Sequence, residues 1–180
     1  GSVYILNDIV DRERDRIHPR KSMRPIPSGR ISVTGAAAYG ALLAVVGAAT
    51  ALYVGQLFVI SALAYVAVAV SYTFLLKNVV ILDAIMVAVG FVVRALAGTI
   101  AIDVPISPWL IICVFLLALF LAFGKRRHEL AILGDEASDH REILGHYSTR
   151  MVDDMMVVAT STLIMAYSMY TFLATNQYMM

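Results

Sequence analysis

Long apolar runs constrain this chain more than any other feature of its sequence. A run of about 18 or more apolar residues is long enough to cross a bilayer as a helix. We predict five spans: Val33–Val54, Leu57–Leu76, Val79–Ile102, Trp109–Phe123 and Met155–Ala174. The fourth is short, and we expect its helix to continue into the charged residues that follow. Because 60% of the 180 residues are apolar and gather in these runs, the sequence predicts an all-α, polytopic transmembrane helical bundle.

The charges between the spans predict the orientation of the bundle. The loops at residues 8–32 and 124–154 are rich in Lys and Arg, and Lys77 follows the second span. The other two connections carry no charge or only Asp103. Because basic residues gather on the cytosolic side of a membrane, we expect both long loops and Lys77 to face the cytosol at the plasma membrane. The net charge of +1 gives no sign of a nucleic-acid partner, and the single Cys113 excludes a disulfide framework.

An acidic motif lies shortly before the first span. Asn7, Asp8, Asp11 and Asp15 form the pattern NDxxDxxxD. On a helix, Asn7, Asp11 and Asp15 would lie one above another on one face, with Asp8 at its border. Carboxylates so placed repel one another unless a cation lies between them, and hard oxygen ligands favour Mg²⁺ or Ca²⁺. The alternative is a solvated charged segment in which the neighbouring arginines neutralise the acids.

The loop that follows the acidic motif carries cations suited to phosphate. Lys21 and Arg24 lie in a segment stiffened by prolines. An arginine can bind phosphate oxygens through two parallel hydrogen bonds. The alternative for these residues is anchoring of the loop on the cytosolic side.

The run from Asn7 to Gly29 resembles the first aspartate-rich motif of the UbiA-type intramembrane prenyltransferases. The matching elements are NDxxDxxxD, then HPxKxxRPI and Gly29. This resemblance extends over the whole chain and implies a bundle of nine helices in the full protein. We expect the chain to be a fragment of one catalytic domain, from the end of the second helix through the seventh. The resemblance further implies that Asp8, Asp11 and Asp15 are catalytic and that, with Asn7, they hold Mg²⁺ against a diphosphate.

The end of the second predicted span resembles another element of this family. The family has a tyrosine and a lysine spaced as YxxxK, whereas one more residue separates Tyr72 from Lys77 here. We expect both to bind a substrate phosphate; the alternatives are an interfacial aromatic residue and an inside-positive anchor. Asp83 and Arg94 are the charged residues within the spans as predicted. Because an unpaired charge is costly in a membrane, we expect each to find a partner across the bundle.

The loop after the fourth span departs from the pattern of the ordinary prenyltransferases. The superfamily carries a second aspartate-rich motif there, but the helix end in this chain reads KRRHEL, and a DxxxD spacing follows only at Asp135 and Asp139. This departure resembles the branch of the superfamily that transfers phosphoribose to polyprenyl phosphate.

The basic residues of the KRRHEL segment suit the substrate that this branch implies. Lys125, Arg126 and Arg127 would offer cations to the 5-phosphate of phosphoribosyl diphosphate, although positive-inside topology is their alternative explanation. Glu129 lies four residues after Lys125. On a helix it could orient that lysine or contact a ribose hydroxyl.

The predicted function is Mg²⁺-dependent transfer of a 5-phosphoribosyl group from phosphoribosyl diphosphate to a polyprenyl (decaprenyl) phosphate, in the synthesis of lipid-linked sugar precursors of a cell wall. The predicted substrate-binding residues are Lys21, Arg24, Tyr72, Lys77, Lys125, Arg126, Arg127 and Glu129. One alternative is prenyl transfer to an aromatic or haem-like acceptor, with Asp135 and Asp139 forming a second Mg²⁺ site. A membrane transporter is the alternative from another class, and a homo-oligomer remains open.

Overall fold

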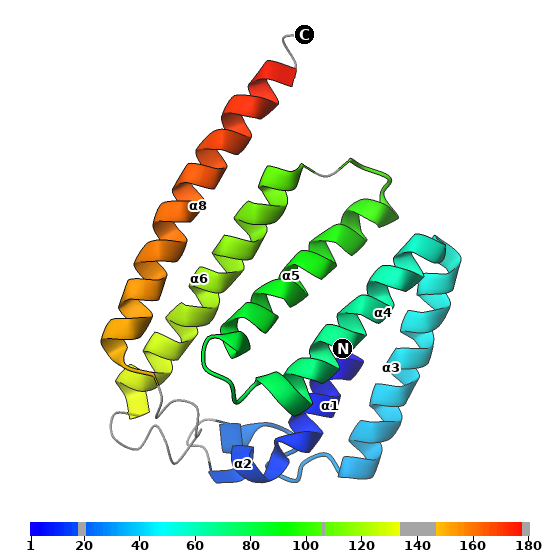
Figure 1. Cartoon of the computed structure of the whole chain (residues 1–180). Coiled ribbons are helices and arrows are strands. Elements are labelled where there is room, and N and C mark those ends of the chain that lie inside the picture. Colours follow the sequence, from blue (N-terminus) through cyan, green and yellow to red (C-terminus); the bar gives the residue numbers. More distant parts are fainter. Residues whose placement is uncertain (18–20, 106, 134–146, 178–180) are drawn as a thin grey trace. The chain divides into compact units, whose positions relative to one another are not determined.

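The computed structural model describes residues 1–17, 21–105, 107–133 and 147–177, and these residues fold into helices and their connections (Figure 1). Five helices in this part of the chain are long and apolar enough to cross a membrane: Val33–Val54, Gln56–Leu76, Leu82–Ala101, Pro108–Ile132 and Thr149–Leu173. The predicted fold class and all five spans are therefore confirmed. The fourth helix continues through the charged residues to Leu133, as expected.

The chain divides into two compact units, Gly1–Val66 and Ala67–Met180. The first unit holds helices α1 (Ser2–Val10), α2 (Arg12–Ile17), η1 (Lys21–Met23) and α3 (Val33–Val54), and the first part of α4 (Gln56–Ser71).

Helix α1 packs against helix α3 in the first unit. The approach is close at Gly40, where an added Cβ atom would lie 3.4 Å from the Ile5 side chain. Ser32 caps the start of α3 by accepting a hydrogen bond from the Gly35 amide at 3.1 Å. Gly55 separates α3 from α4 with a φ of 137°, which glycine adopts without steric cost. These features bring the acidic segment alongside a membrane helix.

The second unit contains the rest of α4, a π-helical turn labelled η2 (Tyr72–Leu76), and helices α5 (Leu82–Ala101), α6 (Pro108–Leu133) and α8 (Thr149–Gln177). Helix α6 packs against both α5 and α8. Their core is formed by Ala84, Ala122, Phe123, Tyr147 and Val152. It lies where α5 and α8 begin and along the second half of α6, so these parts of the three helices are fixed relative to one another.

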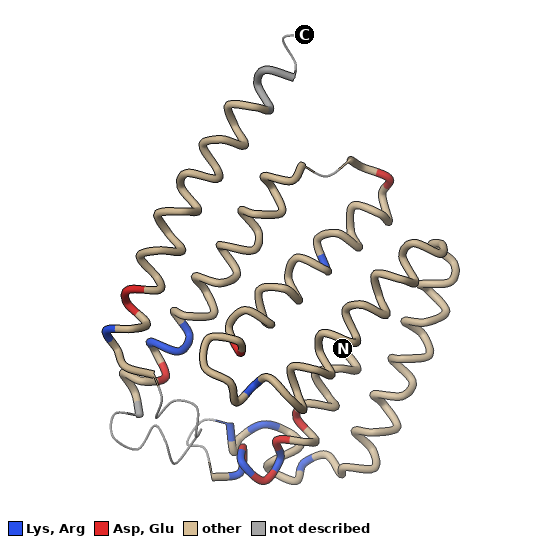
Figure 2. The backbone as a smooth tube through the Cα atoms, viewed as in Figure 1, with Lys and Arg blue, Asp and Glu red and all other residues tan. Residues whose placement is uncertain are grey.

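Most of the charged residues that the structure describes in the second unit lie at that same end of its helices (Figure 2). Asp103 lies at the other end of α5, beyond its last residue. Arg94 lies in the middle of α5, with its guanidinium over the Phe91 ring at 4.4 Å. The polar groups of this unit are therefore concentrated at the charged end of its helices.

Candidate active site

The sequence suggested that the acidic motif lies on one uninterrupted helix. In the structure it is divided between two helices. Asn7 and Asp8 belong to the last turn of α1, Asp15 belongs to α2, and Asp11 lies at the junction with φ −88° and ψ 4°. The i+4 hydrogen bonding nevertheless continues through the junction. The Asp11 amide donates to the Asn7 carbonyl at 2.9 Å, and the Asp15 amide donates to the Asp11 carbonyl at 2.8 Å. The spacing of the motif is thus kept across a bend in the backbone.

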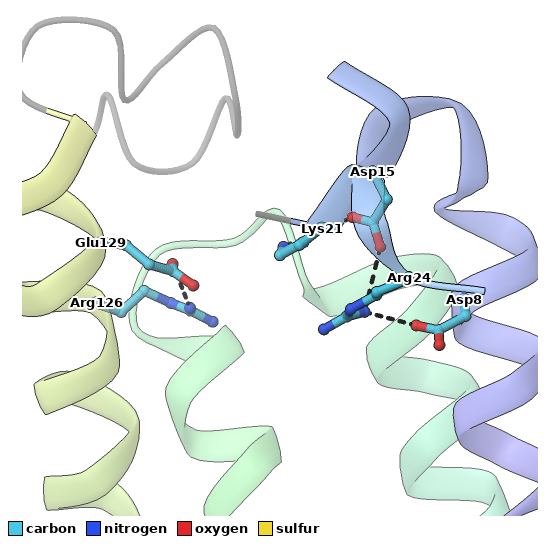
Figure 3. Close-up of polar contacts among 6 residues, drawn as sticks. All are labelled: Asp8, Asp15, Lys21, Arg24, Arg126 and Glu129. Atoms are coloured by element: carbon cyan, nitrogen blue, oxygen red, sulfur yellow. Dashed lines mark hydrogen bonds and ion pairs between the residues drawn. The ribbon is translucent and has the colours of Figure 1, made fainter. Parts of the chain in front are cut away.

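One guanidinium joins two of the predicted metal ligands (Figure 3). Arg24 Nη1 donates to Asp8 Oδ1 at 2.8 Å and to Asp15 Oδ2 at 3.3 Å. Lys21 Nζ lies 3.7 Å from the other oxygen of Asp15. Asp15 is buried, Asp8 is partly exposed and Arg24 is exposed. The predicted phosphate-binding cations and the predicted metal-binding acids therefore lie in one cluster.

Turns in the following loop hold these cations in place. The Ile31 amide donates to the Pro25 carbonyl at 3.0 Å, and the Gly29 amide donates to the Ile26 carbonyl at 3.1 Å. Gly29 has a φ of 79°, a left-handed conformation that favours glycine. Arg16 of α2 donates to the Pro27 carbonyl at 3.3 Å, which ties the loop back to the acidic segment. The loop is therefore a folded support for Lys21 and Arg24.

The donor set of this cluster suits Mg²⁺ that is shared with a phosphate-bearing ligand. Among the residues that the structure describes, no group of three or more His, Cys, Asp or Glu residues converges to form a metal site from protein ligands alone. Protein-bound Mg²⁺ commonly takes one or two carboxylates together with water and substrate phosphates. Asp8 and Asp15 both accept a hydrogen bond from the same nitrogen of Arg24. Their carboxylates are therefore close enough together to suit one such ion. Metal binding by all four residues, Asn7, Asp8, Asp11 and Asp15, stays a prediction.

The extra residue between Tyr72 and Lys77 is taken up by the π-helical turn. The Lys77 amide donates to the Tyr72 carbonyl at 3.0 Å, an i+5 hydrogen bond. A π-turn widens the helix by one residue, so residues five apart are stacked as residues four apart are in an α-helix. The longer spacing therefore gives the relation between the two residues that YxxxK would give on an α-helix.

A buried polar network lies at the charged end of the second unit. Asp83, in the first turn of α5, is 0% exposed, and Arg126 on α6 is 3% exposed. Arg126 Nε donates to Asp83 Oδ2 at 2.6 Å, and the Tyr147 hydroxyl donates to Asp83 Oδ1 at 2.6 Å. Burial and the hydrogen bond to Asp83 raise the pKa of Tyr147 above its usual range, so the phenol stays protonated and can donate. The partner that Asp83 was expected to need is thus found.

The three basic residues of the KRRHEL segment have different surroundings. Lys125 and Arg127 are exposed, and Arg127 Nε donates to Asp153 of α8 at 3.1 Å. Arg126 is buried and donates to Glu129 through Nη1 at 3.0 Å (Figure 3). The partner observed for Glu129 is therefore Arg126, where the sequence had suggested Lys125.

Asp135 and Asp139 lie outside the described residues. Tyr147 was not assigned a role from the sequence, because a tyrosine that follows a polar loop carries no local signal of what it contacts. The available signal was Asp83, a charge near a membrane edge that requires a buried donor.

The fold and these two clusters define a class, namely a multi-span α-helical membrane protein with paired carboxylates and cations at the ends of its helices. The chain belongs to the UbiA prenyltransferase family, which residues 1–179 match.

Two relatives and one solved structure show the extent of the similarity. The chain is 32% identical over 172 residues to the decaprenyl-phosphate phosphoribosyltransferase of Mycolicibacterium smegmatis, covering 96% of this chain and 54% of that protein. It is 31% identical over 180 residues to the enzyme of the same name from Corynebacterium glutamicum, covering 96% and 52%. The chain thus spans about half the length of these curated relatives.

The solved structure is a UbiA homolog from Archaeoglobus fulgidus bound to GPP and Mg²⁺. It superposes with a TM-score of 0.78 at 19% identity, covering 96% of this chain and 62% of that one. This similarity shows that the two chains share a fold.

Proposed function

We propose that the complete protein transfers a 5-phosphoribosyl group from phosphoribosyl diphosphate to a polyprenyl phosphate, with Mg²⁺ as the cofactor. The observation that carries the proposal is the cluster in which Arg24 and Lys21 lie against the carboxylates of Asp8 and Asp15. Such a cluster offers oxygens to a divalent ion and cations to the phosphates that the ion accompanies. The names of the two relatives support phosphoribose as the group transferred and decaprenyl phosphate as the acceptor.

In this proposal Asp8, Asp11 and Asp15, with Asn7, hold the metal. When bound, Mg²⁺ would neutralise the charge that develops on the diphosphate leaving group. Lys21 and Arg24 bind phosphate oxygens of the diphosphate. When the substrate is bound, these contacts replace part of their present contacts with Asp8 and Asp15. The transfer needs no general base, because the attacking phosphate oxygen of the lipid is already an anion.

The remaining phosphate-binding residues belong to the second unit. Lys125 and Arg127 are exposed cations and remain candidates for the 5-phosphate. Tyr72 and Lys77 are brought into a stacked relation by the π-turn and remain candidates for a phosphate group. Arg126 is buried between Asp83 and Glu129, so we assign it to the positioning of side chains. We further propose that the reaction takes place at the cytosolic face of the plasma membrane and supplies a lipid-linked sugar precursor for a cell wall.

Two pairs of substrates test the proposal. The full-length protein is reconstituted with Mg²⁺ and given labelled phosphoribosyl diphosphate with polyprenyl phosphate, or labelled prenyl diphosphate with an aromatic acid. We expect product from the first pair, loss of that product with EDTA, and loss on Asp11→Asn. Asp103→Asn is the matched control, since Asp103 lies beyond the far end of α5 and its positive φ suits asparagine.

The outcomes separate the classes of function. Turnover of the second pair alone would replace the proposal with prenyl transfer. Equal turnover by the Asp11→Asn variant would remove the acidic motif from the chemistry, and the absence of any turnover would return a transporter to consideration.

A further inference from the structure

A chain of hydrogen bonds connects Tyr147 to Glu129 at the charged end of the second unit. The Tyr147 hydroxyl donates to Asp83 at 2.6 Å, Arg126 donates to the other oxygen of Asp83 at 2.6 Å, and Arg126 also donates to Glu129 at 3.0 Å. We propose that Tyr147 is a positioning residue for the carboxylate of Glu129, acting through Asp83 and Arg126. This inference deepens the proposed function and rests on it for the identity of the substrate.

From Asp83 to Glu129, exposure increases along the chain of hydrogen bonds. The side chain of Asp83 is 0% exposed, that of Arg126 is 3% exposed, and that of Glu129 is 16% exposed. A guanidinium that is almost inaccessible and held by two carboxylates is poorly placed to bind a phosphate from solution. The group that this network presents to a ligand is therefore the carboxylate of Glu129, although the sequence of the segment is basic.

Tyr147 controls the buried end of the network because its hydroxyl makes two contacts. It donates to Asp83 and accepts a hydrogen bond from the Ile81 amide at 2.7 Å. Ile81 has a φ of 69°, which is unfavourable for a β-branched residue. Because Ile81 immediately precedes α5, the contact from Tyr147 fixes both the start of that helix and the carboxylate two residues later.

The chemistry of Glu129 indicates which part of a substrate it would bind. A carboxylate accepts hydrogen bonds and repels phosphate oxygens, whereas a sugar hydroxyl is a suitable donor to it. One oxygen of Glu129 already accepts from Arg126, which fixes the direction of the other oxygen. We therefore assign Glu129 to the ribose hydroxyls of phosphoribosyl diphosphate, so Tyr147 should affect the affinity for this donor and not for the lipid acceptor.

A double-mutant cycle in the full-length protein tests this assignment. Tyr147→Phe, Glu129→Gln and the double variant are compared by steady-state kinetics in each substrate. Each single substitution should raise KM for phosphoribosyl diphosphate about tenfold and leave KM for polyprenyl phosphate unchanged. The double variant should be no worse than Glu129→Gln alone, because both changes disable one interaction. Tyr167→Phe is the control, since Tyr167 is exposed on α8 and its ring neighbours that of Tyr170.

Effects of the two single substitutions that multiply in the double variant would overturn the assignment. So would a Tyr147→Phe protein that is less stable but has both KM values unchanged. If Tyr147→Phe does not fold, Asp83→Asn takes its place in the cycle and must show the same non-additivity. If the wild-type protein uses prenyl diphosphate instead, the proposed function fails, and the assignment of Glu129 to ribose hydroxyls fails with it, because that donor has none. The coupling of Tyr147 to Glu129 is then tested by repeating the cycle with that donor. Additive effects would then end the positioning role as well, and non-additive effects would retain it.

Discussion

Two neighbouring arginines on α6 should differ strongly in their contribution to stability. Arg126 is 3% exposed and lies 2.6 Å from an Asp83 carboxylate that is 0% exposed. Arg127 and its partner Asp153 are 45% and 49% exposed at 3.1 Å. Replacing one partner of a buried ion pair leaves the other charge buried and uncompensated, whereas an exposed pair is screened by water. We therefore compare Arg126→Met with Arg127→Met.

The expected magnitudes follow from burial. Loss of Arg126 should reduce the free energy of unfolding by about 3–5 kcal/mol. Loss of Arg127 should reduce it by about 1 kcal/mol or less. Adding Asp83→Asn to Arg126→Met should recover much of the loss, because the fully buried carboxylate is then neutral and the asparagine carbonyl can still accept from Tyr147. The double variant should thus be more stable than Arg126→Met alone.

Reversible unfolding of the full-length protein in mixed micelles measures these differences. Helical circular dichroism is followed as the fraction of denaturing detergent increases, and the free energies are compared at one micelle composition. Equal losses for the two single methionine variants would refute the reasoning from burial. A double variant that is less stable than Arg126→Met would refute the claim that the uncompensated charge causes the loss.

Three further predictions address other parts of the chain. Deleting Leu75 should convert the π-turn into an α-turn and keep Tyr72 stacked with Lys77, so that turnover survives. An alanine inserted after Leu75 should abolish turnover. Loss of turnover on the deletion and survival on the insertion would contradict the π-turn argument. Arg24→Ala should lower thermal stability in EDTA, because Asp8 and Asp15 lose their cation. Mg²⁺ should therefore stabilise this variant more than the wild type. An equal effect of Mg²⁺ on both proteins would argue against the acid cluster as the metal site. Because the pKa of Tyr147 is raised on folding, its contribution to stability should be fully present below about pH 10 and should fall as the pH rises further. Thermal unfolding measured against pH should show this fall in the wild type and not in Tyr147→Phe. An identical fall in both proteins would contradict the assignment.

The spans could be predicted from the sequence because the signal is local. An apolar run of sufficient length must be helical in a bilayer, since its backbone groups have no other partners there. The predicted Val33–Val54 coincides with α3, and the other four spans agree with the structure apart from their ends. The acidic residues of the first motif and the cations of the loop after it could also be identified from neighbouring residues alone.

Contacts between distant residues could not be predicted in the same way. Three consecutive basic residues look alike in the sequence, and only the packing of α6 against α5 buries Arg126 while leaving Arg127 exposed. The interruption at Asp11 was also missed, because the i+4 spacing of the motif is compatible with a bend that keeps the same backbone hydrogen bonds. The requirement of Asp83 for a partner was foreseeable, but its donor Tyr147 comes from 64 residues away.

Binding of phosphoribosyl diphosphate, measured by calorimetry without the lipid acceptor, tests the central claim most directly. The claim is that the acidic segment holds this donor through Mg²⁺. The full-length wild-type protein and its Asp103→Asn control should bind the donor when Mg²⁺ is present and lose binding in EDTA, and Asp11→Asn should weaken binding by at least about tenfold. Binding that is equally strong without Mg²⁺, or unchanged by Asp11→Asn, would contradict it.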